Sequence, residues 1–349
     1  MTQIQTIKNQ GFALKLSQDE SLKSSERIEL IDKEVPVLSK GQVLIKMLAS
    51  SVNPSDLVYL RGKYGLPPKD NAYCGFEGVG IVIDANAGLY GRWLTGKRVA
   101  ISAQPGVDGV WAKYAVTKAN FCLPVRNDIS DEQAATLIVN PCTSVCLVER
   151  AKALGAKAIV INAAASQVGK GVIRYAKRLG ITTIATVRSQ ANQVILQNIG
   201  ADYVLNTQED NFDERLKTLA NQHKATVLLD AIAAQDTPKL LKVMPKSSTA
   251  IVYGRLSETH DPLGGFFSVA DVIFRDIKIE GFWLATYIGK AKPWQVLALS
   301  RKVQKLFSSG VFKTDIYASV GFQDFAAAID HYGEHKSDGK VILLPQLDE

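Results

Sequence analysis

Residues 158–188 constrain the fold of this chain more than any other stretch. Ala158 to Ala163 is a short apolar run with several β-branched residues, typical of a buried parallel strand. A turn of small residues follows, and Val168 to Leu179 then carries apolar residues at helical spacing as far as Gly180. Thr183 to Val187 has the composition of a second strand. The pattern predicts a βαβ unit whose turn directs backbone N–H groups, at the positive end of a helix, toward an anion.

The turn of this unit has a reduced form of the glycine-rich dinucleotide fingerprint. Residues 164–169 read Ala-Ala-Ser-Gln-Val-Gly, so only Gly169 remains where three glycines are usual. Small residues still permit a close approach of the backbone to a pyrophosphate. The loop taken alone also fits a βαβ unit that binds no dinucleotide.

The end of the second predicted strand adds information about the nucleotide. NAD sites place an acidic residue about 20 residues after the loop, where it binds the ribose 2′-hydroxyl. This chain has Arg188 and Ser189 there, and a guanidinium suits a 2′-phosphate. We therefore expect NADPH in preference to NADH; the alternative is a solvated arginine at a strand end.

Composition excludes several functional classes. The 349 residues exceed one typical core, so we expect two domains, and the 46% hydrophobic and 21% charged residues are ordinary for a globular protein. The net charge of +7 is spread over scattered lysines, which does not indicate nucleic-acid binding. No run reaches the roughly 20 apolar residues of a membrane span, and residues 1–10 lack an apolar signal region. The four cysteines form no C-x-x-C pair, so we expect reduced thiols and a cytoplasmic location.

The order of elements predicts an α/β chain of two domains. Short alternating strands separated by glycines fill the chain to about residue 122, which suggests a partly open β-barrel. Helices then alternate with short apolar strands, which is typical of a doubly wound parallel sheet. The last segment is too short for a domain of its own. We therefore assign residues 1–124 and 290–349 to a catalytic domain and residues 125–289 to a nucleotide-binding domain.

In this order of elements and in several motifs, nearly the whole chain resembles the medium-chain dehydrogenase/reductase superfamily. Within it, the chain is similar to the zinc-free quinone oxidoreductase and 2-enoyl thioester reductase branch. The resemblance implies a GroES-like catalytic domain and a Rossmann nucleotide-binding domain. The motifs are residues 52–56 (Val-Asn-Pro-Ser-Asp), 62–65 (Gly-Lys-Tyr-Gly), 140–143 (Asn-Pro-Cys-Thr), 166–169 (Ser-Gln-Val-Gly), 187–188 (Val-Arg), 281–284 (Gly-Phe-Trp-Leu) and 337–340 (Ser-Asp-Gly-Lys).

The metal ligands of zinc-dependent members have no counterparts here. Those members have a cysteine at the place of Asn53 and a histidine before the acid, where this chain has Phe76 followed by Glu77. Asparagine and phenylalanine cannot replace thiolate and imidazole on Zn²⁺. We therefore expect neither a catalytic nor a structural zinc.

The resemblance implies hydride transfer from NADPH to a conjugated C=C bond or to a quinone. Without a metal, hydrogen-bond donors must stabilise the charge that develops on the conjugated oxygen. By similarity to enoyl thioester reductases, Tyr64 is the candidate donor, because a phenol with a pKa near 10 keeps its proton at neutral pH. Asn53 is a candidate for orienting the substrate or the nicotinamide ribose. The alternative for Tyr64 is packing against the nicotinamide.

Cofactor-binding positions are likewise implied by the resemblance. The pyrophosphate would meet the 165–169 loop, the 2′-phosphate would meet Arg188 and its neighbours, and the nicotinamide would meet residues 282–284. Lys340 would reach a phosphate. The candidate residues are Asn140, Ala165, Ser166, Gln167, Val168, Gly169, Arg188, Ser189, Gln190, Tyr253, Gly254, Arg255, Leu256, Phe282, Trp283, Leu284 and Lys340.

Three functional hypotheses follow. The first is an NADPH-dependent, zinc-independent reductase of quinones or conjugated carbonyl compounds. The second is a trans-2-enoyl thioester reductase; the polar segment 287–290, where enoyl reductases often carry a second tryptophan, favours the first over it. The third is a non-catalytic NADPH-binding sensor or structural protein. The family also implies a homodimer formed through an edge strand of the nucleotide-binding domain.

Overall fold

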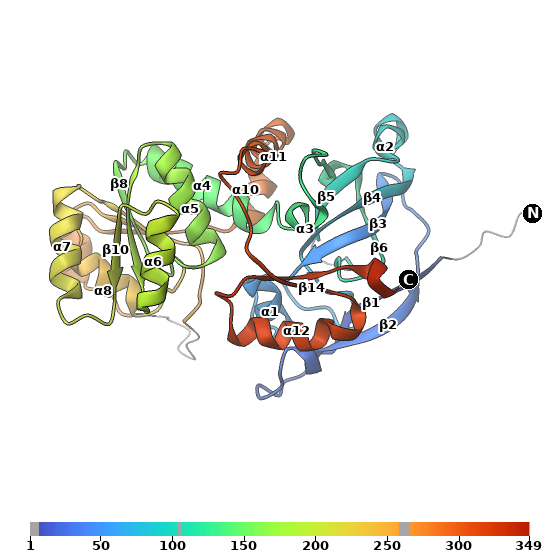
Figure 1. The fold of residues 1–349 in the computed structure, drawn as a ribbon, viewed down its shortest axis with the longest axis horizontal. Helices are drawn as coiled ribbons and strands as arrows, with labels where there is room; N and C mark the ends of the chain where they lie inside the picture. The colour runs from blue at the N-terminus through green and yellow to red at the C-terminus, as the bar shows by residue number, and fades with distance from the viewer. Residues whose placement is uncertain (1–6, 104–106, 258–264, 349) are drawn as a thin grey trace, which may run out of the picture. The chain divides into compact units, whose positions relative to one another are not determined.

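A computed structural model describes residues 7–103, 107–257 and 265–348 of the chain. The chain forms two compact units, one of residues 1–139 and 297–349 and the other of residues 140–296 (Figure 1). From the sequence we predicted the domain boundaries at residues 124/125 and 289/290, in an α/β chain with one β-barrel domain and one parallel-sheet domain. The fold class is confirmed: a barrel-like sheet occupies the first unit and a parallel sheet with helices occupies the second.

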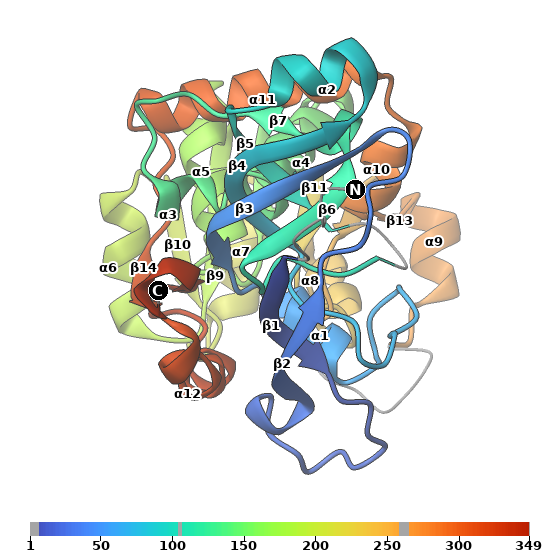
Figure 2. The same cartoon turned by 90° about the vertical axis from the view of Figure 1, so that its right-hand side faces the viewer.

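The first unit contains a strongly bent sheet in the order β14-β15-β3-β4-β5-β7, with β6 also paired to β3, and a separate β1-β2 hairpin (Figure 2). Its strands are β1 Lys8–Leu14, β2 Ile28–Glu34, β3 Gln42–Ser51, β4 Glu77–Asn86, β5 Arg98–Ser102, β6 Tyr114–Lys118, β7 Leu123–Pro124, β14 Ile316–Val320 and β15 Lys340–Leu343. Its helices are α1 Pro54–Leu60, α2 Gly88–Leu94, α3 Asp131–Ala134 and α12 Phe322–Glu334, and α11 Pro293–Ser308 begins before the boundary.

Strand pairing and aromatic packing in the first unit join distant parts of the chain. A Cβ atom on Gly80 would lie 2.4 Å from the Lys46 carbonyl oxygen, so glycine is required where β4 crosses close to β3. The C-terminal segment returns to this unit, because β15 pairs with the end of β3. In the core, the Phe325 ring of α12 lies 5.1 Å from the rings of both Phe12 and Trp111.

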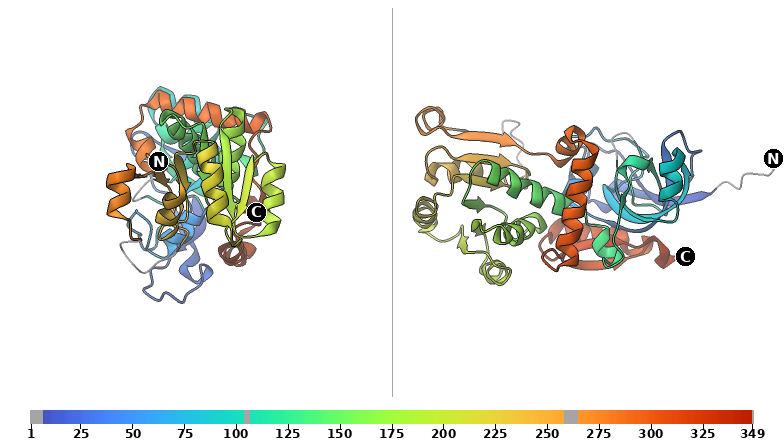
Figure 3. Two further views of the ribbon diagram at one scale, coloured as in Figure 1. Left: turned by 90° about the vertical axis from the view of Figure 1, so that its left-hand side faces the viewer. Right: turned by 90° about the horizontal axis from the view of Figure 1, so that it is seen from above.

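The second unit is a six-stranded parallel sheet in the order β10-β9-β8-β11-β12-β13, with helices on both faces (Figure 3). Its strands are β8 Ala158–Ile161, β9 Thr182–Val187, β10 Tyr203–Asn206, β11 Val227–Asp230, β12 Thr249–Val252 and β13 Lys278–Gly281. Its helices are α4 Val139–Ala153, α5 Gln167–Arg178, α6 Gln190–Asn198, α7 Phe212–Gln222, α8 Asp236–Val243, α9 Val269–Arg275 and α10 Leu284–Lys290.

This strand order fixes where a ligand can bind. The chain winds outward from β8 to β10 and then crosses to β11 on the other side of β8. Doubly wound sheets bind their ligands at such a switch of direction, which here lies at the carboxyl ends of β8 and β11.

Candidate active site

The loop after β8 is built to receive an anion. Ser166 is the N-cap of α5, and its hydroxyl oxygen accepts the Gly169 N–H at 3.1 Å. A Cβ atom on Gly169 would lie 2.4 Å from the Ala164 carbonyl oxygen, so only glycine permits this close helix–strand contact. The one glycine that the fingerprint retains is therefore the one that packing requires.

Most of the predicted cofactor residues lie at one edge of the parallel sheet. They follow the carboxyl ends of β8, β9, β12 and β13, which meet at the same edge because the strands are parallel. Asn140 lies instead in the first turn of α4. The residues at the sheet edge are Ala165, Ser166, Gln167, Val168 and Gly169 after β8, Arg188, Ser189 and Gln190 after β9, Tyr253, Gly254, Arg255 and Leu256 after β12, and Phe282, Trp283 and Leu284 after β13.

Arg188 is exposed at the end of β9, and its positive charge partly offsets the rise that burial causes in the pKa of Asp236. Ser189 caps α6 through its hydroxyl, which accepts the Asn192 N–H at 3.4 Å. The guanidinium is thus carried by a short turn between a strand and a capped helix. This geometry leaves it available to a phosphate.

Asp230 was not among the residues predicted from the sequence, and it stabilises the turns after β8 and β11. Asp230 is fully buried at the end of β11, and it accepts the Asn162 side-chain amide at 2.5 Å and the Ile232 and Ala233 N–H groups, each at 2.9 Å. Asn162 in turn accepts the Ala231 N–H at 2.7 Å. These bonds fix the ends of β8 and β11 against each other. The sequence signal for this role is an aspartate at the end of an apolar strand.

Tyr253 presents a buried polar atom toward the same edge. Its hydroxyl oxygen is buried, and it lies close enough to the Ser166 side chain for that residue to favour the ionised phenol. Burial, together with the nearby Asp230 charge, raises the pKa of Tyr253, so its hydroxyl stays protonated. A protonated hydroxyl beside the Ser166 turn fits a site that takes an oxygen-rich ligand.

In the first unit, Asn53 lies in a buried polar network and not on a surface. The residue is the N-cap of α1 and is fully buried. Its side-chain N–H group donates to Glu77 Oε1 at 3.1 Å and to Ser51 Oγ at 3.3 Å, and its carbonyl oxygen accepts from Lys340 Nζ. Because these bonds engage both ends of the amide, the structure indicates that Asn53 orients its neighbours.

Lys340 has a different place from the one that the sequence suggested. It is fully buried at the start of β15, and its ammonium donates to the Val52 carbonyl at 2.7 Å as well as to Asn53. It also lies 5.7 Å from the centre of the Tyr332 ring. An ammonium enclosed in this way does not reach a phosphate, so we assign it to the network of Asn53.

Asp56 and Glu77 complete the charges of this network, and neither was among the predicted site residues. Asp56 Oδ2 accepts the Asn53 N–H at 2.7 Å, whereas Oδ1 has no partner among the described residues. Burial raises the pKa of Asp56 to about 7, against the opposing effects of Asn53 and Lys340. Burial likewise lowers the pKa of Lys340 to about 8, against the two carboxyls. The low-polarity surroundings thus disfavour the charged forms of both groups.

Tyr64 belongs to an aromatic cluster beside this network. It is half-buried in the loop after α1, and its ring lies 5.1 Å from that of Phe76. The Tyr59 ring also contacts Phe76, with ring centres 5.4 Å apart. Phe76 directly precedes the buried Glu77 in the chain. The Tyr64 ring therefore packs on the residue next to this carboxylate.

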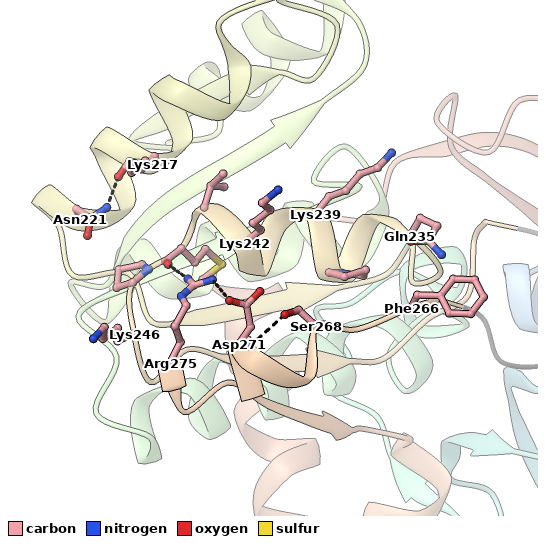
Figure 4. A pocket seen from close by; sticks show the side chains of 14 residues that line it. Lys217, Asn221, Gln235, Lys239, Lys242, Lys246, Phe266, Ser268, Asp271 and Arg275 are labelled. Carbon is pink, nitrogen blue, oxygen red and sulfur yellow. Dashed lines mark hydrogen bonds and ion pairs between the residues drawn. The ribbon is translucent and has the colours of Figure 1, made fainter. Parts of the chain in front are cut away.

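A groove of about 760 Å³ lies between α7, α8 and α9 in the second unit (Figure 4). Lys239 and Lys242 of α8 lie along it, and Arg275 of α9 is bonded to Asp271 at 3.2 Å. None of the sequence-predicted site residues lines this groove. This groove is therefore separate from the sheet edge that carries the predicted cofactor residues.

The described residues contain neither a metal-binding cluster nor a membrane-spanning helix. Among them, no group of three or more His, Cys, Asp or Glu side chains is arranged to hold a metal ion. Within the same residues, every helix is too short or too polar to cross a bilayer.

Comparisons with known proteins agree with this architecture. The alcohol dehydrogenase GroES-like domain family matches residues 39–127, and the zinc-binding dehydrogenase family matches residues 168–301. The mitochondrial enoyl-[acyl-carrier-protein] reductase of Rattus norvegicus is 31% identical over 308 residues, covering 87% of this chain and 81% of the relative.

Solved structures show the same fold over the whole chain. A Mesorhizobium loti protein, assigned provisionally as an NADPH:quinone reductase, is 32% identical with a TM-score of 0.86, covering 99% of this chain and 100% of the other. The Etr1p/NADP/crotonyl-CoA complex has a TM-score of 0.78 at 18% identity, covering 97% and 100%, which shows a shared fold. The chain belongs to the medium-chain dehydrogenase/reductase superfamily, in its zinc-free branch of quinone oxidoreductases and 2-enoyl thioester reductases.

Proposed function

We propose that this chain is an NADPH-dependent, zinc-independent oxidoreductase that reduces quinones or other conjugated carbonyl compounds. The observation that carries the proposal is the pairing of two phosphate-binding features on adjacent strands. The Ser166-capped turn follows β8, and the exposed Arg188 guanidinium follows β9. The full-length likeness to the Mesorhizobium loti protein supports the same activity.

The residues at the sheet edge fit the cofactor. First-turn N–H groups of α5 face the pyrophosphate position, and the buried Tyr253 hydroxyl lies beside Ser166, the N-cap of the same helix. When bound, NADPH supplies a hydride. In this proposal the Tyr64 hydroxyl donates a hydrogen bond to the acceptor oxygen and holds the proton that neutralises it.

Replacing Arg188 by Ala is expected to lower the preference for NADPH over NADH by about tenfold or more, because a charge-assisted hydrogen bond to a phosphate contributes roughly 1.5–3 kcal/mol. The measurement is kcat/KM with each cofactor at one fixed acceptor concentration. The rate with NADH should hardly change.

Arg178 supplies a matched control for this substitution. It is also exposed, but it ends α5 at the opposite edge of the sheet. Arg178→Ala should leave the cofactor preference unaltered. A preference for NADPH that survives Arg188→Ala would remove the assignment of the 2′-phosphate to Arg188.

Enoyl thioester reduction is the second candidate. The identity to mitochondrial enoyl-[acyl-carrier-protein] reductases, at 31% over most of the chain, specifically favours it. Both reactions use the same donor and the same hydride acceptor chemistry, so the substrate pocket decides between them. Crotonyl-CoA tested beside a set of quinones separates the two by relative kcat/KM.

We also propose that two copies of the chain associate through β13. This strand ends the sheet among the described residues, and nearby apolar side chains are exposed: Phe274 by 75%, Val269 by 71% and Ile273 by 64%. An open strand edge with an adjacent apolar helix is suited to antiparallel pairing with a second copy.

Phe274→Glu is expected to convert a dimer into a monomer, because it places a charge in the apolar part of the interface. Light scattering after gel filtration gives the mass of each form. Leu89→Glu, at an 83% exposed position of the first unit, is the control and should stay dimeric. A wild-type protein that is monomeric at micromolar concentration would contradict the proposal.

A further inference from the structure

Four hydrogen-bond donors converge on the buried carboxylate of Glu77. Its Oε1 accepts from Ser51 Oγ at 3.0 Å and from Asn53 Nδ2 at 3.1 Å. Its Oε2 accepts the backbone N–H groups of Ile138 at 3.0 Å and Val139 at 2.8 Å. Every neighbour is a donor, so this geometry requires a carboxylate that acts only as an acceptor.

The two carboxylate oxygens of Glu77 contact different segments of the chain. Oε1 contacts the N-cap of α1, the helix that leads into Tyr64. Oε2 contacts the first residue of α4, directly before Asn140 and at the point where the chain passes from the first unit to the second. One side chain therefore ties the segment that carries Tyr64 to the segment that carries Asn140.

The Asn53 amide stands between two opposite charges. Its N–H group faces Glu77, and its carbonyl oxygen faces the Lys340 ammonium. Only one orientation of the amide satisfies both, because a flipped amide would point N–H groups at the ammonium. Asp56 fixes the Asn53 backbone from the other side.

We propose that Lys340, Asn53 and Glu77 form a buried relay in which Glu77 is a positioning residue, holding the Tyr64 segment and the start of α4 in the register that reduction requires. The inference rests on the proposed function, since it assigns Glu77 a part in the same reaction. Glu77 touches neither substrate nor cofactor in this proposal; it acts through Asn53 and through the backbone of α4.

Glu77→Gln is the sharpest test, because it keeps the shape of the side chain. Glutamine has one oxygen and one NH₂ group, so at one end its NH₂ must face two donors. We expect kcat to fall by about tenfold or more, the scale of one lost hydrogen bond to a charged group, while the NADPH dissociation constant stays within about threefold. Glu209→Gln, which breaks the surface ion pair with Arg215, is the matched control.

Hydrogen exchange gives a readout that does not depend on activity. Peptides covering residues 137–140 should exchange faster in Glu77→Gln than in the wild type, whereas peptides from α5 should not. If Glu77→Gln does not fold, Ser51→Ala removes one donor and leaves the carboxylate. It should lower kcat in the same direction by about two- to fivefold.

The outcomes separate the relay from the proposed function. An active wild type with an equally active, folded Glu77→Gln variant would overturn the relay alone, as would a loss of kcat that only follows a loss of NADPH binding. A wild type that turns over no acceptor would overturn the proposed function. In that case unchanged exchange at residues 137–140 would also overturn the relay, and faster exchange would support its structural part.

Discussion

Tyr64→Phe is expected to lower kcat/KM for the acceptor by about 100-fold or more, while the affinity for NADPH stays the same. A positioned proton donor typically contributes 10²- to 10⁴-fold, and this substitution removes only the hydroxyl. The ring contact with Phe76, at 5.1 Å, is retained. The measurement is steady-state NADPH oxidation with one quinone and one enone, together with an NADPH titration.

Tyr59 is the natural control for that variant. It packs against the same Phe76 ring, and its hydroxyl accepts the Lys69 N–H at 3.2 Å. Tyr59→Phe should therefore leave the rate nearly unchanged. A Tyr64→Phe enzyme within about threefold of the wild type would mean that Tyr64 only packs beside the reacting groups.

Lys340→Met is expected to destabilise the protein by roughly 3–5 kcal/mol at pH 7, where Lys340 is charged, because it leaves two buried carboxyls without their cation. The loss should be smaller at pH 5, where Asp56, with a pKa of about 7, carries a proton. Adding Asp56→Asn should restore part of the stability. Denaturant unfolding at both pH values measures these differences, and an equal loss at both would contradict the charge account.

The wild type should show a related pH dependence. The pKa of Asp56 is raised from 3.8 to about 7 in the folded protein, so the folded state binds the extra proton across this window. Stability from this group is therefore greatest below pH 4 and falls as the pH rises to 7. Asp56→Asn should remove this fall, whereas Asp84→Asn, at an exposed position, should not.

Local patterns were enough to predict the nucleotide-binding unit. The βαβ unit that the sequence predicted at residues 158–188 appears as β8, α5 and β9. These features depend on neighbours a few residues apart, so the sequence displays them directly. The short helices α2 and α10 were not predicted, since neither has a long apolar face.

The polar network of the first unit could not be predicted from the sequence. Asn53 and Lys340 are 287 residues apart in the chain, and only the return of β15 to β3 brings them together. Resemblance pointed to both residues as parts of a site, but their buried bonds come from tertiary packing. Glu77 was noted only as the acid after Phe76. The roles of Tyr64 and Arg188 stay predictions.

The most direct test of the central claim is NADPH oxidation by the purified wild type with a panel of quinones, enones and crotonyl-CoA, with NADH run in parallel. If the chain is an NADPH-dependent reductase, it should turn over at least one of these acceptors, with NADPH used in clear preference to NADH. Tight NADPH binding without turnover of any acceptor would contradict it and would favour a non-catalytic NADPH-binding protein.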